Sequence, residues 1–162
     1  MHVASNRSSL GILGGAVLAF TAFGLTGCSA VETLYGSGAE PRQHEVDSNA
    51  EFVAGGSAEE NLAYFTKQAD DYSKSSSPID GRSIVDHFVA AGFDKTAMQV
   101  SLDKTALSDN ADSIFASVRI NSQCLIAQFE VSDRTYQVDI APVLLAGESG
   151  YCLIGETRPI DW

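Results

Sequence analysis

Hydrophobic residues recur three or four positions apart between residues 57 and 92, the spacing of helices with one buried face. Ser57 and Glu60 match a capping box at the start of a first helix, because each side chain can bind the other residue's backbone N–H group. Asp80 can cap a second helix, and Gly92 fits the left-handed residue that ends one. We therefore expect two helices in this part of the chain.

Beyond Phe93 the spacing changes, and apolar residues alternate with polar ones, as in strands that bury one face. Asn121 and Ser122 lie between two of these runs and predict a hairpin with a tight turn. The pattern predicts an α+β domain over residues 57–162, in which two N-terminal helices pack on a four- or five-stranded, mainly antiparallel sheet. Strands are expected near residues 98–102, 114–120, 123–131, 136–140 and 151–154.

An uncharged hydrophobic stretch, residues 10–25, follows Arg7 near the start of the chain. A positive start, an apolar run and small residues before a cleavage point are the three zones of an export signal. The stretch is shorter than the roughly 20 residues of a membrane-spanning helix, so a permanent span is the weaker interpretation. A secretory signal that releases a free protein also fits, but it gives no reason for the cysteine that follows. That cysteine closes the sequence Leu25-Thr26-Gly27-Cys28.

This sequence resembles the lipobox of bacterial lipoproteins. The resemblance implies that residues 1–27 are a lipoprotein signal peptide and that the Cys28 sulfur carries a diacylglyceryl group, with acyl chains such as palmitate. Two acyl chains hold a protein stably in a membrane. We therefore expect a protein anchored to the cell membrane through Cys28, on the extracytoplasmic face.

Residues 28–56 would connect this anchor to the domain. The segment mixes glycines, a proline and acidic residues, and no hydrophobic periodicity persists through it. This composition predicts a flexible tether. Tyr35 and Phe52 leave an alternative, in which part of the segment docks on the domain or on a partner.

Composition limits the class of protein. With 44% hydrophobic and 19% charged residues, the chain can bury a core, which favours a globular domain over disorder. The net charge of −11 opposes binding to nucleic acid and to anionic lipid headgroups. We therefore expect no nucleic-acid partner.

Cys124 and Cys152 are the cysteines that remain if Cys28 is lipidated. One such pair in an exported domain favours a disulfide. Each cysteine is followed by a leucine and an isoleucine, so two short neighbouring strands could hold the sulfur atoms side by side. Two buried free thiols are the alternative.

Candidate catalytic residues are few. His87 is the one histidine in the predicted domain, since His2 lies in the signal and His44 in the tether. Residues 147–150 lack the spacing of glycines and serine that makes a nucleophile elbow. We expect His87 to pack beside the apolar face of the second helix rather than to catalyse a reaction, and we expect no cofactor.

The loop from Asp103 to Asp112, which includes Asp109 and Asn110, gathers the oxygen ligands that hard cations such as calcium prefer. Its spacing differs from that of an EF-hand, and Asp and Asn also favour turns by bonding to nearby backbone. A turn is the favoured interpretation, and the sequence leaves a cation site open.

Trp162 is the one tryptophan of the chain and predicts one of two roles. The tail that carries it either folds back and docks on the sheet, which we favour, or presents the indole as an anchor for a partner.

Several short motifs occur in a fixed order: Ala91-Gly92-Phe93-Asp94-Lys95-Thr96-Ala97-Met98, Ala111-Asp112-Ser113-Ile114, Cys124-Leu125-Ile126, Cys152-Leu153-Ile154-Gly155 and Arg158-Pro159-Ile160-Asp161-Trp162. Together they resemble an uncharacterised domain of actinobacterial membrane lipoproteins, over about residues 57–162. The resemblance implies an envelope location and a pair of cysteines, and it brings no activity or catalytic residue with it.

These observations favour a membrane-anchored lipoprotein of the cell envelope, whose extracytoplasmic domain binds a protein or another envelope ligand. One alternative is an envelope hydrolase whose site is hidden by the order of residues in the chain. Another is a structural accessory subunit of a membrane complex. The sequence leaves the identity of the ligand and the oligomeric state open.

Overall fold

The computed structural model describes residues 44–144 and 150–162. The predicted signal peptide, Cys28 and the predicted tether up to residue 43 lie outside the described residues. None of the helices in the described part of the chain is long and apolar enough to cross a membrane. Its elements, in order, are α2 (Ala58–Lys74), α3 (Gly81–Ala90), the 3-10 turn η1 (Lys95–Ala97), β1 (Met98–Val100), β2 (Ser113–Ile120), β3 (Gln123–Glu130) and β4 (Tyr136–Pro142).

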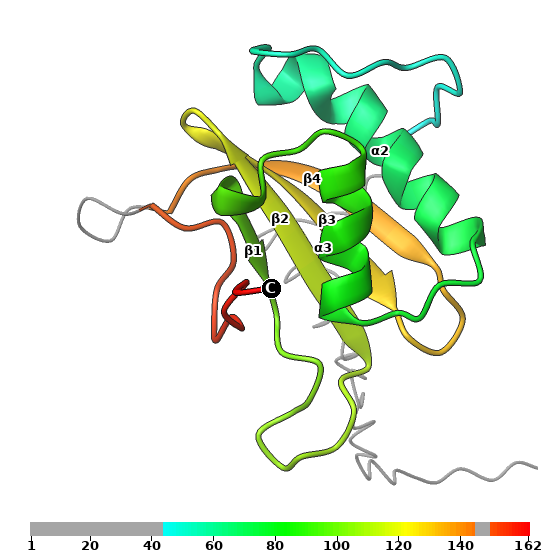
Figure 1. Ribbon diagram of the computed structural model, residues 1–162, viewed down its shortest axis with the longest axis vertical. Coiled ribbons are helices and arrows are strands. Elements are labelled where there is room, and N and C mark those ends of the chain that lie inside the picture. Colours follow the sequence, from blue (N-terminus) through cyan, green and yellow to red (C-terminus); the bar gives the residue numbers. More distant parts are fainter. Residues whose placement is uncertain (1–43, 145–149) are drawn as a thin grey trace, which may run out of the picture. The chain divides into compact units, whose positions relative to one another are not determined.

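The strands form one antiparallel sheet in the order β1-β2-β3-β4, and both helices pack on the same face of it (Figure 1). This confirms the prediction of an α+β domain with a four-stranded antiparallel sheet. The prediction of a fifth strand at residues 151–154 is wrong. The backbone N–H groups of Cys152 and Leu153 bind a side chain of β1 instead of a neighbouring strand, so this segment bends.

Local sequence signals begin and end these elements as predicted. The Ser57 hydroxyl accepts the N–H of Glu60, and the Glu60 carboxylate accepts the N–H of Ser57. The Asp80 carboxylate accepts the N–H of Ser83 at the start of α3, and Gly92 follows the end of this helix with a φ of +103°. Asn121, with a φ of +56°, turns the chain between β2 and β3, and asparagine tolerates this left-handed conformation better than most residues.

The core lies between the helices and one face of the sheet. The rings of Phe65 in α2 and Phe88 in α3 stack with their centroids 4.4 Å apart, which joins the two helices over the strands. Alternate residues of the strands point into this core, as the predicted period of two requires. They include Val100, Ile114, Ala116, Val118, Leu125, Ala127 and Phe129.

The last part of the predicted tether packs on the domain. The ring centroid of Phe52 lies 5.8 Å from that of Tyr64 and 5.2 Å from that of Phe93. The Asn61 side chain both accepts the N–H of Val53 and donates to its carbonyl. The prediction of a flexible tether as far as residue 56 is therefore wrong at this end, and the alternative of a docked Phe52 is correct, because a buried asparagine and three aromatic rings hold the backbone in place.

An arginine from the turn between β3 and β4 closes the C-terminal end of α2. Arg134 donates from Nε to the carbonyl of Ser73 (2.9 Å), from Nη2 to that of Tyr72 (3.0 Å) and from Nη1 to that of Ser77 (2.9 Å). The last carbonyls of a helix have no partner within the helix, and a guanidinium supplies both donors and positive charge. Arg134 therefore joins the sheet to the helix end, a role that the sequence analysis missed.

Replacing Arg134 by alanine should lower the free energy of unfolding by about 2–3 kcal/mol, because three carbonyls lose a charged donor. Arg134→Lys should restore only part of this, since an ammonium group lacks the planar fork of a guanidinium. Chemical denaturation of the full chain measures both changes. Lys74→Ala is the control, because Lys74 lies at the same helix end but its side chain is 72% exposed, so we expect a change within about 0.5 kcal/mol. An equal loss for Lys74→Ala would contradict the role of Arg134.

Candidate functional site

The outer face of the sheet, opposite the helices, carries apolar residues that the core does not use. Phe115 in β2 and Ile126 in β3 occupy positions that alternate with core residues, and both are half-buried. No helix of the described chain covers this face. The signal was present in the sequence, because Phe115 is a large apolar residue at a position that the alternation of β2 assigns to the outer face.

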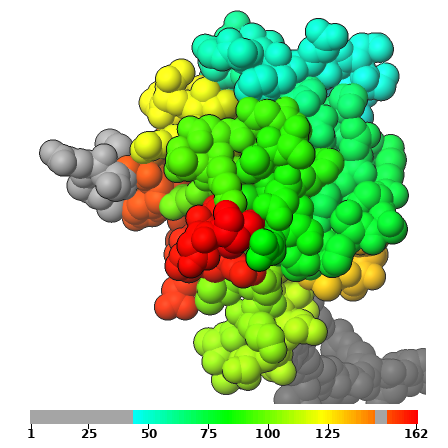
Figure 2. Space-filling view, viewed as in Figure 1, coloured from blue at the N-terminus to red at the C-terminus, as the bar shows by residue number. Residues whose placement is uncertain are grey.

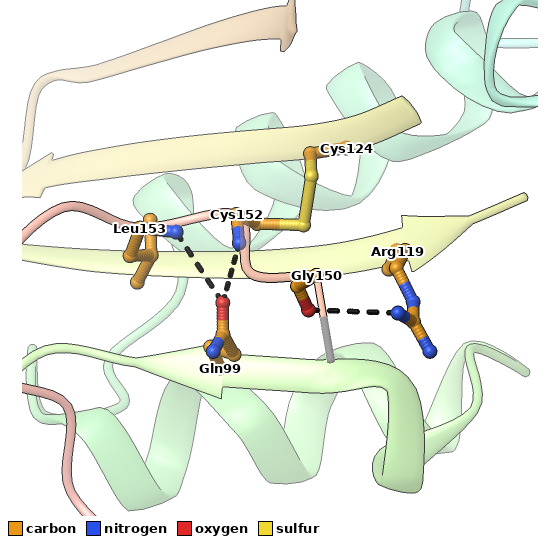
Figure 3. Close-up of a disulfide and its surroundings, with 6 residues drawn as sticks. All are labelled: Gln99, Arg119, Cys124, Gly150, Cys152 and Leu153. Carbon is orange, nitrogen blue, oxygen red and sulfur yellow. Dashed lines mark hydrogen bonds between the residues drawn. A yellow bond between two sulfur atoms is a disulfide. The ribbon is translucent and has the colours of Figure 1, made fainter. Parts of the chain in front are cut away.

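Part of this face is crossed by residues 150–162, which we call the C-terminal segment. Cys152 of this segment forms a disulfide with Cys124 of β3, with the Cα atoms 5.6 Å apart. The Gln99 side chain of β1 accepts the N–H groups of Cys152 (2.6 Å) and Leu153 (3.3 Å), as Figure 3 shows. The predicted disulfide is confirmed, but Cys152 lies on a bent segment that passes over β2 rather than on a neighbouring strand.

The C-terminal segment then follows the outer edge of β1. Thr157 forms an isolated bridge with Ser101, and the N–H of Arg158 donates to the carbonyl of Val100 (3.0 Å). Free strand edges expose unpaired backbone groups, so this pairing protects one side of the sheet.

Asp103 ties this edge to α3. One carboxylate oxygen accepts the N–H of Gly81 (2.6 Å) and the other accepts Nη1 of Arg158 (2.6 Å). Both carboxylate oxygens of Asp103, the first acidic residue of the 103–112 loop, therefore accept hydrogen bonds that hold the fold together. Among the described residues, no group of three or more His, Cys, Asp or Glu side chains could hold a metal ion.

Trp162 docks, but on α3 and η1 rather than on the sheet. Its indole Nε1 donates to Asp86 of α3 (2.8 Å). Three cationic groups lie over the ring, with centroid distances of 5.4 Å for Arg82, 5.1 Å for Lys95 and 4.9 Å for Arg158. Figure 2 shows the C-terminal residues, in red, lying against the green atoms of this part of the chain. The expected docking on the sheet is wrong. The hydrogen bond to Asp86 and the three cation–π contacts hold the indole beyond the edge of β1, against α3 and η1. A partner-binding role for Trp162 stays a prediction.

His87 lies between the two helices, on the side of the sheet away from Phe115. Its Nε2 atom is 3.0 Å from the carbonyl oxygen of Gln68, and its ring packs against Tyr72 with the centroids 5.1 Å apart. Burial, together with the nearby Asp80 carboxylate, raises the pKa of Tyr72 to about 12. The contacts of His87 are those of a residue that joins α2 to α3.

The C-terminal segment and the outer face of the sheet form a groove. Its floor is Phe115 and Ile126, and one wall is made by Leu153 and Ile154. It consists of two hollows of about 360 and 270 Å³ that share this floor. Ile154 is 89% exposed beside it, which is unusual for a large aliphatic side chain on a backbone that a disulfide fixes.

Acidic residues lie at both ends of this groove. Glu156 lines the first hollow and Asp139 of β4 lines the second, and both side chains are exposed. Among residues 44–144 and 150–162, neither hollow is lined by a lysine or an arginine. The groove can therefore bury an apolar group and attract positive charge, and among its described lining residues no hydrogen bond joins a nucleophile to a base.

Comparison with protein families shows which family the described domain resembles. A family model described as "Domain of unknown function (DUF6993)" matches residues 69–156, which is more than half of the chain. The matched part includes both cysteines and all residues that line the groove. Neither the curated proteins nor the solved structures gave a match.

Replacing both Cys124 and Cys152 by alanine should lower the free energy of unfolding by about 3–4 kcal/mol, because the two cysteines are 28 residues apart and their bond restricts the unfolded chain. Chemical denaturation of the full chain measures the loss. Adding reductant to the native protein should produce a similar loss and should leave the double variant unchanged. A native protein with the same stability in reductant would contradict this role of the disulfide.

Proposed function

The chain belongs to the DUF6993 family, and we propose that it is a membrane-anchored lipoprotein of the cell envelope whose extracytoplasmic domain binds a protein partner in the groove described above. The observation that carries the binding role is Ile154, which is 89% exposed beside an apolar floor. Exposed apolar surface that is held in a fixed shape loses little entropy on association, so it favours binding.

The anchor rests on the sequence before the domain. The uncharged run that ends in Leu25-Thr26-Gly27-Cys28 supports lipidation of Cys28. The disulfide between Cys124 and Cys152 supports the same location, because such bonds persist in oxidising compartments outside the cytoplasm. Both observations favour the extracytoplasmic face of the membrane.

Binding is favoured over hydrolysis by the positions of the polar groups. His87 contacts a backbone carbonyl between the helices, on the opposite side of the sheet from the groove. The acids at the groove, Asp139 and Glu156, lie at its two ends rather than together. A structural accessory subunit would use the same groove for one permanent neighbour.

Cys28→Ser should move the protein from the membrane fraction to the soluble fraction, because the hydroxyl cannot accept the diacylglyceryl group. Fractionation of cells and the intact mass of the purified protein measure the change. Ser37→Ala, a neutral change nearby in the predicted tether, is the control and should leave the protein in the membrane. A Cys28→Ser variant that stays in the membrane fraction would contradict the anchor.

Photo-crosslinking tests the groove. A crosslinking amino acid at position 154 should yield one protein adduct in intact cells, whereas the same group at position 107 should not. Leu107 is a matched control, because it is 84% exposed and lines none of the described hollows.

The partner identified in this way should then bind Ile154→Ser about tenfold more weakly than the native chain, since an aliphatic contact is lost, and should bind Leu107→Ser with unchanged affinity. Affinities from fluorescence anisotropy measure this difference. Equal effects of the two substitutions would contradict binding at the groove.

A further inference from the structure

We infer that the occupant of the groove is an extended peptide segment of the partner, with a large apolar residue between two basic ones; this inference rests on the proposed function. In this five-residue segment the first and fifth residues are basic, the third is apolar, and the second and fourth are of any type. The basic residues would meet Glu156 and Asp139, and the apolar residue would lie on Phe115 and Ile126.

The negative charge of the groove favours a basic occupant. Both acids at the groove are exposed, and the lining residues that the structure describes include no cation. A second copy of this chain, with a net charge of −11, would bring acids against acids. The surface of an anionic membrane would be repelled in the same way. A partner with basic residues is attracted by the acidic residue at each end of the groove.

The direction of the groove selects an extended segment. One hollow reaches Ser101 next to β1 and the other reaches Ala141 in β4, so the groove runs across the strands. Three strand spacings amount to about 14 Å. An extended chain rises about 3.3 Å per residue, so about five residues cover this distance.

The alternating directions of side chains in an extended chain determine which residues of the segment face the groove. Successive side chains of an extended chain point to opposite sides, so its first, third and fifth residues face the groove together. The third residue then lies over the apolar floor while the first and fifth lie near the acids. The side chains of the second and fourth residues point away from the groove, so their residue types are not restricted.

Three labelled peptides of five residues test this inference against the full chain, purified with its disulfide intact. The first has lysine at both ends and leucine at the centre, the second replaces both lysines by glutamate, and the third replaces the leucine by serine. Fluorescence anisotropy measures binding. We expect the first peptide to bind about tenfold more tightly than either of the others, since each of those loses one of the two attractions.

Variants of the acids locate the effect. Asp139→Asn combined with Glu156→Gln should remove the preference for lysine over glutamate. Glu45→Gln combined with Asp109→Asn changes the net charge by the same amount at exposed positions outside the groove, and it should keep that preference. Ile154→Ser should weaken the first peptide by about fivefold.

The inference is overturned if the glutamate peptide binds as tightly as the lysine peptide, if no peptide binds, or if the two double variants behave alike. It is also overturned if sedimentation shows a dimer that Ile154→Ser abolishes, or if vesicles of anionic lipid compete with the peptide. If the peptides fail while the crosslinked partner still loses affinity for Ile154→Ser, the proposed function stands and only the peptide pattern is wrong.

Discussion

The attachment of residues 150–162 to both faces of the sheet is the constraint on which the domain depends. The disulfide joins the segment to β3 on the outer face, the Gln99 side chain of β1 accepts two of its backbone N–H groups, and Trp162 contacts α3 on the inner face. Between these points the segment pairs with the edge of β1, a strand of three residues. A strand this short has few hydrogen bonds of its own, so the segment completes the sheet as well as bounding the groove.

Local signals were enough to predict most of the fold. Ser57, Asp80, Gly92 and Asn121 act on backbone groups within a few residues, and a short window of sequence contains everything that decides their role. The alternation of apolar residues likewise fixed which strand residues enter the core. The same window misled at residues 151–154, because an apolar run looks like a strand whether its N–H groups meet another strand or the side chain of Gln99.

The candidate site depends on contacts between distant residues, and the sequence pattern could not supply these. Arg134 reaches carbonyls about sixty positions earlier in the chain, and Gln99 reaches N–H groups more than fifty positions later. The sequence predicted that Cys124 and Cys152 would pair, because few cysteines leave few choices. It could not predict that their bond would place Ile154 beside Phe115, since that requires the path of the segment over the sheet.

Ribosomes synthesise a chain from its N-terminus, so contacts made by its last residues are the last that can form. Residues 152–158 emerge after every strand that they secure. Until they arrive, Cys124 is a thiol and the outside of β1 has no backbone partner. The pairing at the outer edge of β1 therefore forms last, and the bond between the two sulfur atoms can form only once Cys152 has joined Cys124.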